Sequence, residues 1–337
     1  MRTNKFLLIA LAAAGMFTAC SNDDEVVKMN QGNEISFRVQ GGTPSLRTTV
    51  TTLATVDAFV VFGNDNKSDI TNMFNGTTVA RQVTPGTLDP TKPTTGDNIF
   101  AYAPNRYYHK DATRATYMAY SPASAVFESI TIPADIFTPN CVFEYTVPGI
   151  DDSGNTKQMD LLFATYYASS LETNIDFTFT HALSRVFVSA ENKTPDPVII
   201  NKIKFTDLYS TGEIAVNGSD GNWGWGNHSA PADYEYEIAN SGIAVPGNVG
   251  FMRVIAVEQS MMVLPQTPDA GVLEIEYEFR NLGTSTKRLD ISGTTFEKNK
   301  QYQINITFDA GAAITFEVVE VEDFTNAPEV TPPPVLP

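Results

Sequence analysis

Residues that could support acid–base, nucleophilic or metal chemistry are scattered along the 337-residue chain. His109, His181 and His228 lie far apart, and none has a second ligand-type residue at metal-site spacing, so we expect no metal and no cofactor. Carboxylates are plentiful, but nothing singles out two of them as the acid and base of a glycosidase. Neither a Gly-Lys-Ser/Thr phosphate loop nor a Gly-x-Ser-x-Gly nucleophile motif is present. The sequence therefore predicts a protein that is not an enzyme.

The charge balance and the cysteine count narrow the class of protein further. The net charge is −17 and the isoelectric point is near 4.5, which argues against nucleic acid, because phosphate binding needs clustered Lys and Arg. Strong net charge suits a protein kept soluble in an extracellular medium. With only Cys20 and Cys141 in the sequence, a disulfide framework is excluded, and Cys141 is predicted to be a small buried hydrophobe.

The amino terminus predicts export and covalent lipid attachment. Arg2 and Lys5 precede the apolar run Phe6–Met16, which is too short to span a membrane, so residues 1–19 are interpreted as a cleaved signal peptide. The residues up to Cys20 resemble a bacterial lipobox, in which the cysteine is acylated and becomes the first mature residue, although Phe17 stands where an aliphatic residue is usual. An ordinary secretory signal with a cysteine placed by chance is the alternative.

Residues 20–33 are interpreted as a lipidated acidic linker. Its first part resembles the short acidic stretch that directs lipoproteins of Bacteroidetes to the outer face of the outer membrane, and it consists of Ser21, Asn22, Asp23, Asp24 and Glu25. Several acyl chains on one residue would provide a durable anchor. A charged linker without a targeting role is the alternative.

The rest of the chain shows the period-two pattern of β-strands. In Val272–Phe279, apolar residues alternate with Glu274, Glu276 and Glu278, and 302–308 and 175–179 alternate in the same way. Such alternation places one face of each strand in a core. Because these stretches recur between Gly, Pro, Asn and Asp turns, the sequence predicts an all-β protein made of antiparallel sandwiches or barrels.

Two similar closing segments predict two domains. Residues 175–192 and 302–320 each read as strand, short connection and strand, which suggests two sandwich domains with similar endings. A polar, Pro-containing stretch, Glu191–Val198, predicts a boundary there. We therefore expect an amino-terminal β-sandwich over 34–192 and a carboxyl-terminal β-sandwich with a Pro-rich tail over 193–337.

A predicted surface loop, Asn217–Asn227, contains Trp223 and Trp225 among glycines. Exposed tryptophans can stack on sugar rings, so both are candidate glycan contacts. At least one of them could instead fold under the loop and cover a sheet edge. Glycan contact would suit an alternative function, a monomeric glycan-binding lipoprotein at the cell surface. A secreted hydrolase on a β-sandwich is a second alternative.

One long segment resembles a known family. Met159–Asn192 is similar to the most recognisable segment of the fimbrillin-type pilins of Bacteroidales, with matches at Asp160, Leu161, Leu162, Ala164, Phe179, His181, Leu183, Ser184 and Arg185. Further matches are Ala119–Ser124, Met261–Thr267 and Phe296–Phe308, the last with Asn299 in place of the usual glycine. From its neighbours, His181 is expected to brace a hairpin rather than to catalyse a reaction.

The resemblance implies a fold and an assembly mechanism. Such pilins have two antiparallel transthyretin-like β-sandwich domains in tandem, reach the outer membrane surface as lipoproteins, and lose their first strand to an arginine-directed protease. A strand from another fimbrial subunit then fills the groove. The implied partners are therefore other subunits, the outer membrane through the lipid anchor and the protease; host glycans or proteins are further candidates.

The sequence contains the segments that this mechanism needs. Residues 34–40 predict a first strand with Ile35, Phe37 and Val39 facing inward, followed by a linker over 41–49. Within that linker, Arg47 and Thr48 flank the bond most open to cleavage, unless Arg47 is merely a surface arginine. The candidate donor is the carboxyl-terminal region from Ile314 onward, and the pattern leaves open whether it is a free donor or an integral last strand.

Overall fold

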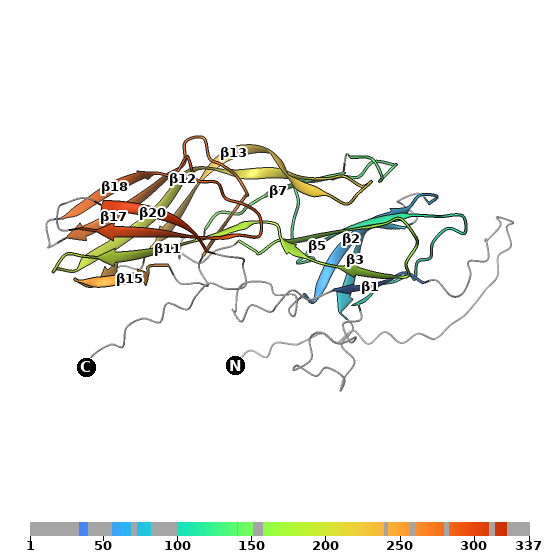
Figure 1. The fold of residues 1–337 in the computed structure, drawn as a ribbon, viewed down its shortest axis with the longest axis horizontal. Helices are drawn as coiled ribbons and strands as arrows, with labels where there is room; N and C mark the ends of the chain where they lie inside the picture. Colours follow the sequence, from blue (N-terminus) through green and yellow to red (C-terminus); the bar gives the residue numbers. More distant parts are fainter. Residues whose placement is uncertain are drawn as a thin grey trace, which may run out of the picture.

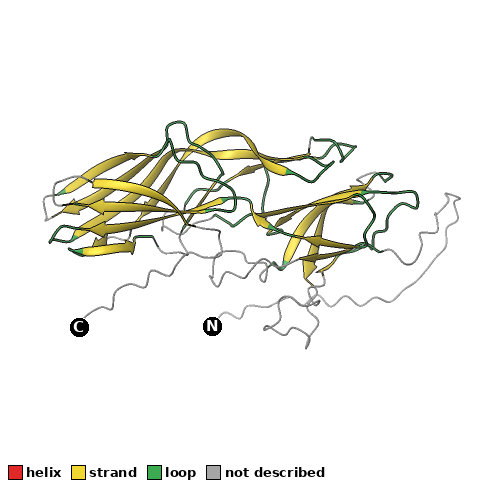
Figure 2. Ribbon diagram, in the orientation of Figure 1, coloured by secondary structure: helices red, strands yellow, loops and turns green. Residues whose placement is uncertain are grey.

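The computed structural model describes residues 34–39, 56–68, 73–81, 100–139, 141–150, 158–238, 242–255, 260–279, 283–309 and 314–321. Over these ranges the chain forms β-strands and no helix, so the predicted all-β class is confirmed (Figure 2). Accordingly, no helix in the described ranges is long and apolar enough to cross a membrane.

The first sheet contains the amino-terminal strands and lies at the right of Figure 1. Its eight strands, in spatial order, are β10 (Thr180–His181), β8 (Leu162–Ala168), β5 (Ala115–Ser121), β2 (Ala58–Asp65), β3 (Phe74–Arg81), β4 (Phe100–Ala101), β1 (Ser36–Val39) and β9 (Asn174–Phe177). All neighbouring pairs are antiparallel except β1 and β9, which run parallel. The first strand of the chain is therefore inserted between two later strands.

Two further sheets contain the later strands. One consists of β15 (Val249–Arg253), β11 (Ser184–Asn192), β19 (Gln301–Phe308) and β20 (Ile314–Val321), with β16 (Met261–Val263) also paired to β11. The other consists of β18 (Thr284–Asp290), β17 (Val272–Phe279), β12 (Val198–Val216), β7 (Cys141–Thr146) and β6 (Ser129–Thr131), with β13 (Trp223–Glu237) and β14 (Ile243–Val245) paired to β12.

A long ribbon of β12 and β13 runs along both halves of the molecule (Figure 1). The first part of β12 pairs with β17, and its last part pairs with β7. Register shifts interrupt the ribbon between Phe205 and Leu208 and between Thr211 and Glu213. Bulges of this kind bend a strand and increase its twist, so the two ends of β12 can pair with different strands, and all buried apolar side chains of the ribbon belong to one cluster.

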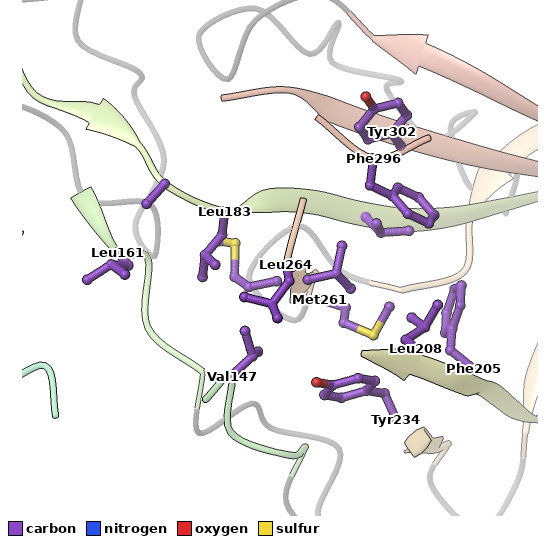
Figure 3. Close-up of a cluster of buried hydrophobic side chains, with 14 of the residues drawn as sticks. Val147, Leu161, Leu183, Phe205, Leu208, Tyr234, Met261, Leu264, Phe296 and Tyr302 are labelled. Atoms are coloured by element: carbon purple, nitrogen blue, oxygen red, sulfur yellow. The ribbon is translucent and has the colours of Figure 1, made fainter. Parts of the chain in front are cut away.

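Two clusters of buried side chains hold the sheets together. Strand β5 is buried on both faces: Tyr117 and Ala119 belong to a smaller cluster inside the first sheet, and Met118 and Tyr120 belong to a larger cluster. Figure 3 shows part of the larger cluster, where Leu183, Met261 and Tyr234 meet from separate elements. Alternation along one strand therefore supplies two cores, as expected when both faces of a sheet are covered.

Strand pairing crosses the predicted boundary after residue 192. Strand β11 lies at the end of the predicted amino-terminal domain, and it pairs in parallel with β19, from Arg185 opposite Gln301 to Asn192 opposite Phe308. Strand β7 likewise pairs with β12. The segment 175–192 is thus not a hairpin, whereas β19 and β20 do form one. Alternation predicts which side chains are buried but not which strands are neighbours. The count of two independent domains stays a prediction.

Buried tyrosines should make the fold sensitive to alkali. Burial raises the pKa of Tyr102, Tyr108 and Tyr145 to about 12, and it raises the pKa of Tyr117 well above its usual value. An unfolded tyrosine titrates near pH 10, so folding favours the neutral phenol. We expect the free energy of unfolding to be unaffected by these groups below about pH 10 and to fall between about pH 10 and 12. Urea unfolding at a series of pH values, followed by circular dichroism, would measure this; constant stability up to about pH 12 would contradict it.

Candidate functional site

The candidate site is the first-strand seat, which we define as the space between β4 and β9 that β1 occupies. Phe37 lies opposite Phe100 of β4, and on the other side Ser36–Val39 run parallel to Asn174–Phe177. A parallel neighbour cannot come from a tight turn, so β1 reaches this place only through long-range contacts. It is joined to β2 by residues 40–55.

The apolar side chains at and just before β1 belong to the smaller core cluster. Ile35, which precedes the strand, and Phe37 and Val39 within it are 0%, 1% and 7% exposed, whereas Arg38 faces solvent. This alternation matches the pattern expected from the sequence. The three side chains therefore form part of the core of the first sheet, although their strand is only four residues long.

Phe37 lies at the centre of a group of aromatic rings. Its ring stacks on Phe177 with centroids 5.6 Å apart and planes 12° apart, and it meets Phe74 edge-on at 5.0 Å. Three more rings have their centroids within 6.3 Å: Phe59, Tyr102 and Tyr117. Aromatic pairs in these geometries add to the stabilisation from burial. The seat is thus shaped for an aromatic ring at its centre.

Polar contacts complete the seat at the amino-terminal end of β1. The backbone N–H of Ile35 donates to the carbonyl oxygen of Arg106 at 3.0 Å, and that of Ser36 donates to Thr173 at 2.7 Å. The hydroxyl of Tyr102 donates to the carbonyl oxygen of Ile35 at 2.5 Å. No local sequence pattern predicts these partners, because the bonded residues lie 67 or more positions apart.

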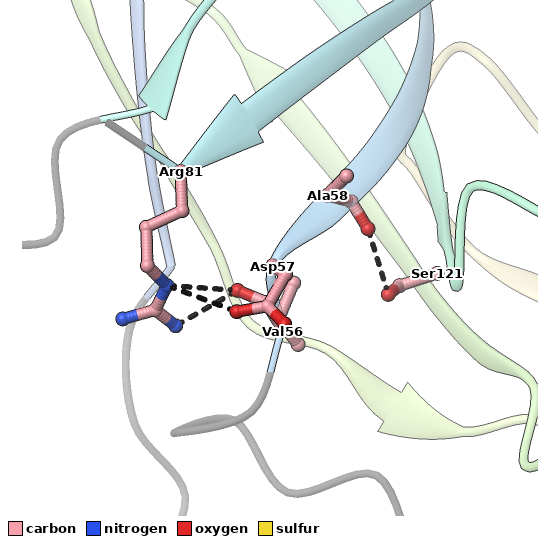
Figure 4. A network of polar contacts seen from close by, with 5 residues as sticks. All are labelled: Val56, Asp57, Ala58, Arg81 and Ser121. Atoms are coloured by element: carbon pink, nitrogen blue, oxygen red, sulfur yellow. Dashed lines mark hydrogen bonds and ion pairs between the residues drawn. The ribbon is translucent and has the colours of Figure 1, made fainter. Parts of the chain in front are cut away.

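The start of β2 is fixed independently of β1 (Figure 4). The Arg81 guanidinium donates to the carbonyl oxygen of Val56 at 2.8 Å and lies 3.9 Å from the Asp57 carboxylate. The Ser121 hydroxyl donates to the carbonyl oxygen of Ala58 at 3.0 Å. These contacts hold the start of β2, and none of them involves a residue of β1.

Several predicted site residues lie outside the described residues. They are Cys20; the acidic stretch Ser21, Asn22, Asp23, Asp24 and Glu25; the linker 41–49 with Arg47 and Thr48; and the tail over 322–337. Their lipidation, export and cleavage stay predictions. Within the described ranges, no group of three or more His, Cys, Asp or Glu side chains could hold a metal ion. Cys141 is buried, as predicted, and burial raises the pKa of its thiol to about 12.

The two tryptophans are placed differently from the prediction of a surface loop. Trp223 and Trp225 belong to β13 and pair with Val216 and Ile214 of β12. Both are half-buried against the larger cluster, and the Trp225 indole N–H donates to the carbonyl oxygen of Ala182 at 2.6 Å. A glycan contact at these residues stays a prediction, but both side chains already have structural partners.

The ring of Trp223 contacts two other side chains. It meets the Phe163 ring with centroids 5.0 Å apart, and the Lys298 ammonium lies 3.6 Å from its centroid. A cation over an indole face is a favourable contact. Stacking on a sugar would require Lys298 to move if the sugar approached from that face.

Two polar residues of the segment that resembles fimbrillin-type pilins, His181 and Arg185, have structural contacts. Nδ1 of His181 lies 2.8 Å from the Asp160 carboxylate, which ties β10 to the segment before β8. Arg185 is buried at the start of β11, and its Nε donates to the Ser260 hydroxyl at 2.5 Å. The expectation that His181 has a bracing contact agrees with this geometry, although the brace joins β10 to β8 rather than closing a hairpin.

Comparison with known proteins identifies the family. A family model described as Fimbrillin-like matches residues 46–323. The chain belongs to the fimbrillin-like family. Among curated proteins no match was found. The matched region begins at residue 46, after the end of β1 at Val39, so β1 lies outside it.

Solved structures share the fold of this fimbrillin-like chain. A fimbrial protein from Bacteroides vulgatus is 14% identical, with 86% of this chain and 98% of that chain covered and a TM-score of 0.59. A candidate cell adhesion protein from Bacteroides ovatus is 16% identical, with 88% and 98% covered and a TM-score of 0.52. At such low identity, these likenesses establish the fold alone.

The ring cluster predicts which residue of β1 matters most for stability. Replacing Phe37 with Ala should lower the free energy of unfolding by about 3–5 kcal/mol, because it removes a buried ring and leaves a cavity. The matched control is Arg38→Ala in the same strand, which should change it by less than about 0.5 kcal/mol because the side chain is exposed. Urea unfolding followed by circular dichroism measures both variants. Equal losses in the two would contradict the role assigned to the aromatic centre of the seat.

Proposed function

We propose that this fimbrillin-like protein is a structural subunit of a surface fimbria that polymerises by strand exchange. Proteolysis after β1 allows this strand to be replaced by a strand of another subunit. The observation that carries the proposal is that β1 is buried in a core, yet its covalent link to the body is the single segment 40–55. A strand attached in this way can be exchanged once the segment is cut.

The energetics favour refilling of a vacated seat. Full burial of an apolar side chain contributes about 1.5–3 kcal/mol, and three such side chains leave with β1. Each lost backbone hydrogen bond removes a further net contribution of about 0.5–1.5 kcal/mol. An emptied seat exposes apolar rings and unpaired edges on β4 and β9, a surface that binds an added strand.

The body of the subunit is suited to survive the loss of β1. The side chains of Ile35, Phe37 and Val39 belong to the smaller cluster, and the larger cluster contains no side chain of β1 among the described residues. Arg81 holds the start of β2 independently of the first strand. We therefore expect the cut subunit to keep its larger core while its seat is exchanged.

We place the cut between Arg47 and Thr48, made by an arginine-directed protease. The other nearby arginine, Arg38, lies within β1. The backbone of this strand is already paired with β9, so it is not free to bind in a protease active site. Lipidation at Cys20 and the acidic stretch that follows would present the subunit at the outer membrane surface. The partners are then further fimbrial subunits, the membrane and the protease.

The donor strand that we favour is β20 of a second copy. Residues 314–318 read Ile-Thr-Phe-Glu-Val, and residues 35–39 read Ile-Ser-Phe-Arg-Val, so apolar residues of the same type recur at the same spacing. Strand β20 lies at the edge of its sheet, paired with β19 alone among the described strands, and Phe316 is half-buried. It could therefore leave one sheet and place Phe316 in the position of Phe37.

Limited proteolysis tests the assembly mechanism. Full-length protein treated with a trypsin-like protease should form ladders of bands that resist SDS, because each inserted strand is held by a buried core. The Arg47→Ala variant, which keeps the fold but lacks the bond to be cut, should stay monomeric under the same treatment. If the wild-type protein is cut at Arg47 and remains a monomer, the proposal is wrong.

A peptide tests the donor. A peptide of residues 314–321 should bind the cut subunit, and its Phe316→Ala form should bind about a hundredfold or more weakly, because the loss of a buried ring costs about 3–5 kcal/mol. A Glu317→Arg peptide should bind about two- to fivefold more tightly, since position 38 pairs in register with Asp176 and like charges across strands repel. Fluorescence anisotropy measures all three. Equal affinity of the native and Phe316→Ala peptides would exclude β20 as the donor.

A further inference from the structure

The two ends of β1 are held by different kinds of contact. From Phe37 to Val39 the strand is held by its ladder to β9, by the pairing with Phe100 and by burial of its side chains. From Glu34 to Ser36 it is held by further contacts from two segments, Tyr102–Tyr108 and Glu172–Asn174, and Ser36 also lies in the ladder, opposite Asn174 of β9. We call these two segments together the clasp.

The first segment of the clasp surrounds the backbone of Ile35. The carbonyl oxygen of Arg106 accepts from the Ile35 N–H at 3.0 Å, while the Tyr102 hydroxyl donates to the Ile35 carbonyl oxygen at 2.5 Å. The Arg106 N–H donates to the same hydroxyl at 3.4 Å, and Glu34 forms an isolated bridge with Tyr107. Both polar groups of the Ile35 backbone are thereby satisfied by this segment.

The second segment of the clasp holds Ser36. The Ser36 N–H donates to the Thr173 carbonyl oxygen at 2.7 Å, and its hydroxyl donates to the Asn174 side-chain oxygen at 2.7 Å. The Tyr108 hydroxyl donates to the carbonyl oxygen of Glu172 at 2.6 Å, which joins the second segment to the first. The clasp is therefore one connected structure that closes around the start of β1.

We propose that the clasp retains β1 after the chain is cut, so that cleavage and strand release are separate steps and the strand leaves from its Val39 end. Tyr102 is in this view a positioning residue for strand exchange. The inference rests on the proposed function. Its physical basis is that the contacts that hold Ile35 and Ser36 do not depend on the covalent link at 40–55.

Retention of β1 has a consequence for the cell surface. The cut frees the carboxyl-terminal end of β1, which is the end without a clasp, and leaves the clasped end attached to the preceding residues. If those residues carry the lipid at Cys20, a cut subunit stays bound to the membrane through β1 alone. It leaves only when an incoming strand enters from the Val39 side and displaces β1 as far as the clasp.

The first test measures retention of the cut strand. Protein cut with a trypsin-like protease should carry its β1 fragment through size-exclusion chromatography, with the fragment identified by mass spectrometry. Tyr102→Phe and Ser36→Ala should each release the fragment about three- to tenfold faster, because each removes hydrogen bonds of the clasp. The matched control is Tyr209→Phe, which removes a 2.6 Å bond to Asp269 and should release it at the wild-type rate.

The second test measures the direction of release. In the uncut protein, a Val39→Cys thiol should react with a labelling reagent faster than an Ile35→Cys thiol, with the wild-type protein as the blank. Adding Tyr102→Phe should accelerate labelling at position 35 by about three- to tenfold, whereas Tyr209→Phe should not. Faster labelling at position 35 than at position 39 would overturn the proposed direction.

The outcomes separate the clasp from the proposed function. Immediate loss of the fragment on cutting, or equal release from the Tyr102→Phe and Tyr209→Phe proteins, would overturn the clasp even if ladders form. Retention of the fragment with faster release from Tyr102→Phe, but no ladders with any donor strand, would support the clasp and refute assembly by strand exchange.

Discussion

The burial of Phe37 among aromatic rings is the interaction on which the amino-terminal sheet depends. The ring belongs to a strand of four residues, yet it contacts side chains from β2, β3, β5 and β9. A short strand cannot hold itself in place through local propensity, so its position follows from this shared core. The same arrangement supports the proposed exchange of the strand, because another chain with an equivalent ring would satisfy the same neighbours.

The buried side chains form two separate clusters, and β1 contributes to only one of them. The larger cluster extends from β2 and β5 through the β12–β13 ribbon to β19, whereas the smaller one is closed on one side by β1 and β9. In the proposed strand exchange, the smaller cluster would open while the larger one stays packed. Polar contacts follow the same division, since Arg81 holds the start of β2 and the clasp holds the start of β1.

Placement within the family agrees with this physical reading. The fimbrillin-like match covers residues 46–323, and structures of a fimbrial protein and of a candidate cell adhesion protein share the fold at 14% and 16% identity. At such identities the likeness establishes the fold alone. The individual features that we connect with assembly, namely the seat, the clasp and the edge strand β20, are accordingly argued from this chain's own residues.

Period-two alternation was sufficient to predict the β class and the inward face of individual strands. It placed Leu273 and Ile275 in the core, and it placed Ile35, Phe37 and Val39 inward. Only the tertiary structure decided which strands are neighbours: β1 beside β9, β11 beside β19, and the tryptophans in a paired strand instead of a loop. The physical reason is that a side chain's face is set by its own backbone, whereas pairing partners and the clasp depend on contacts between residues far apart in the sequence.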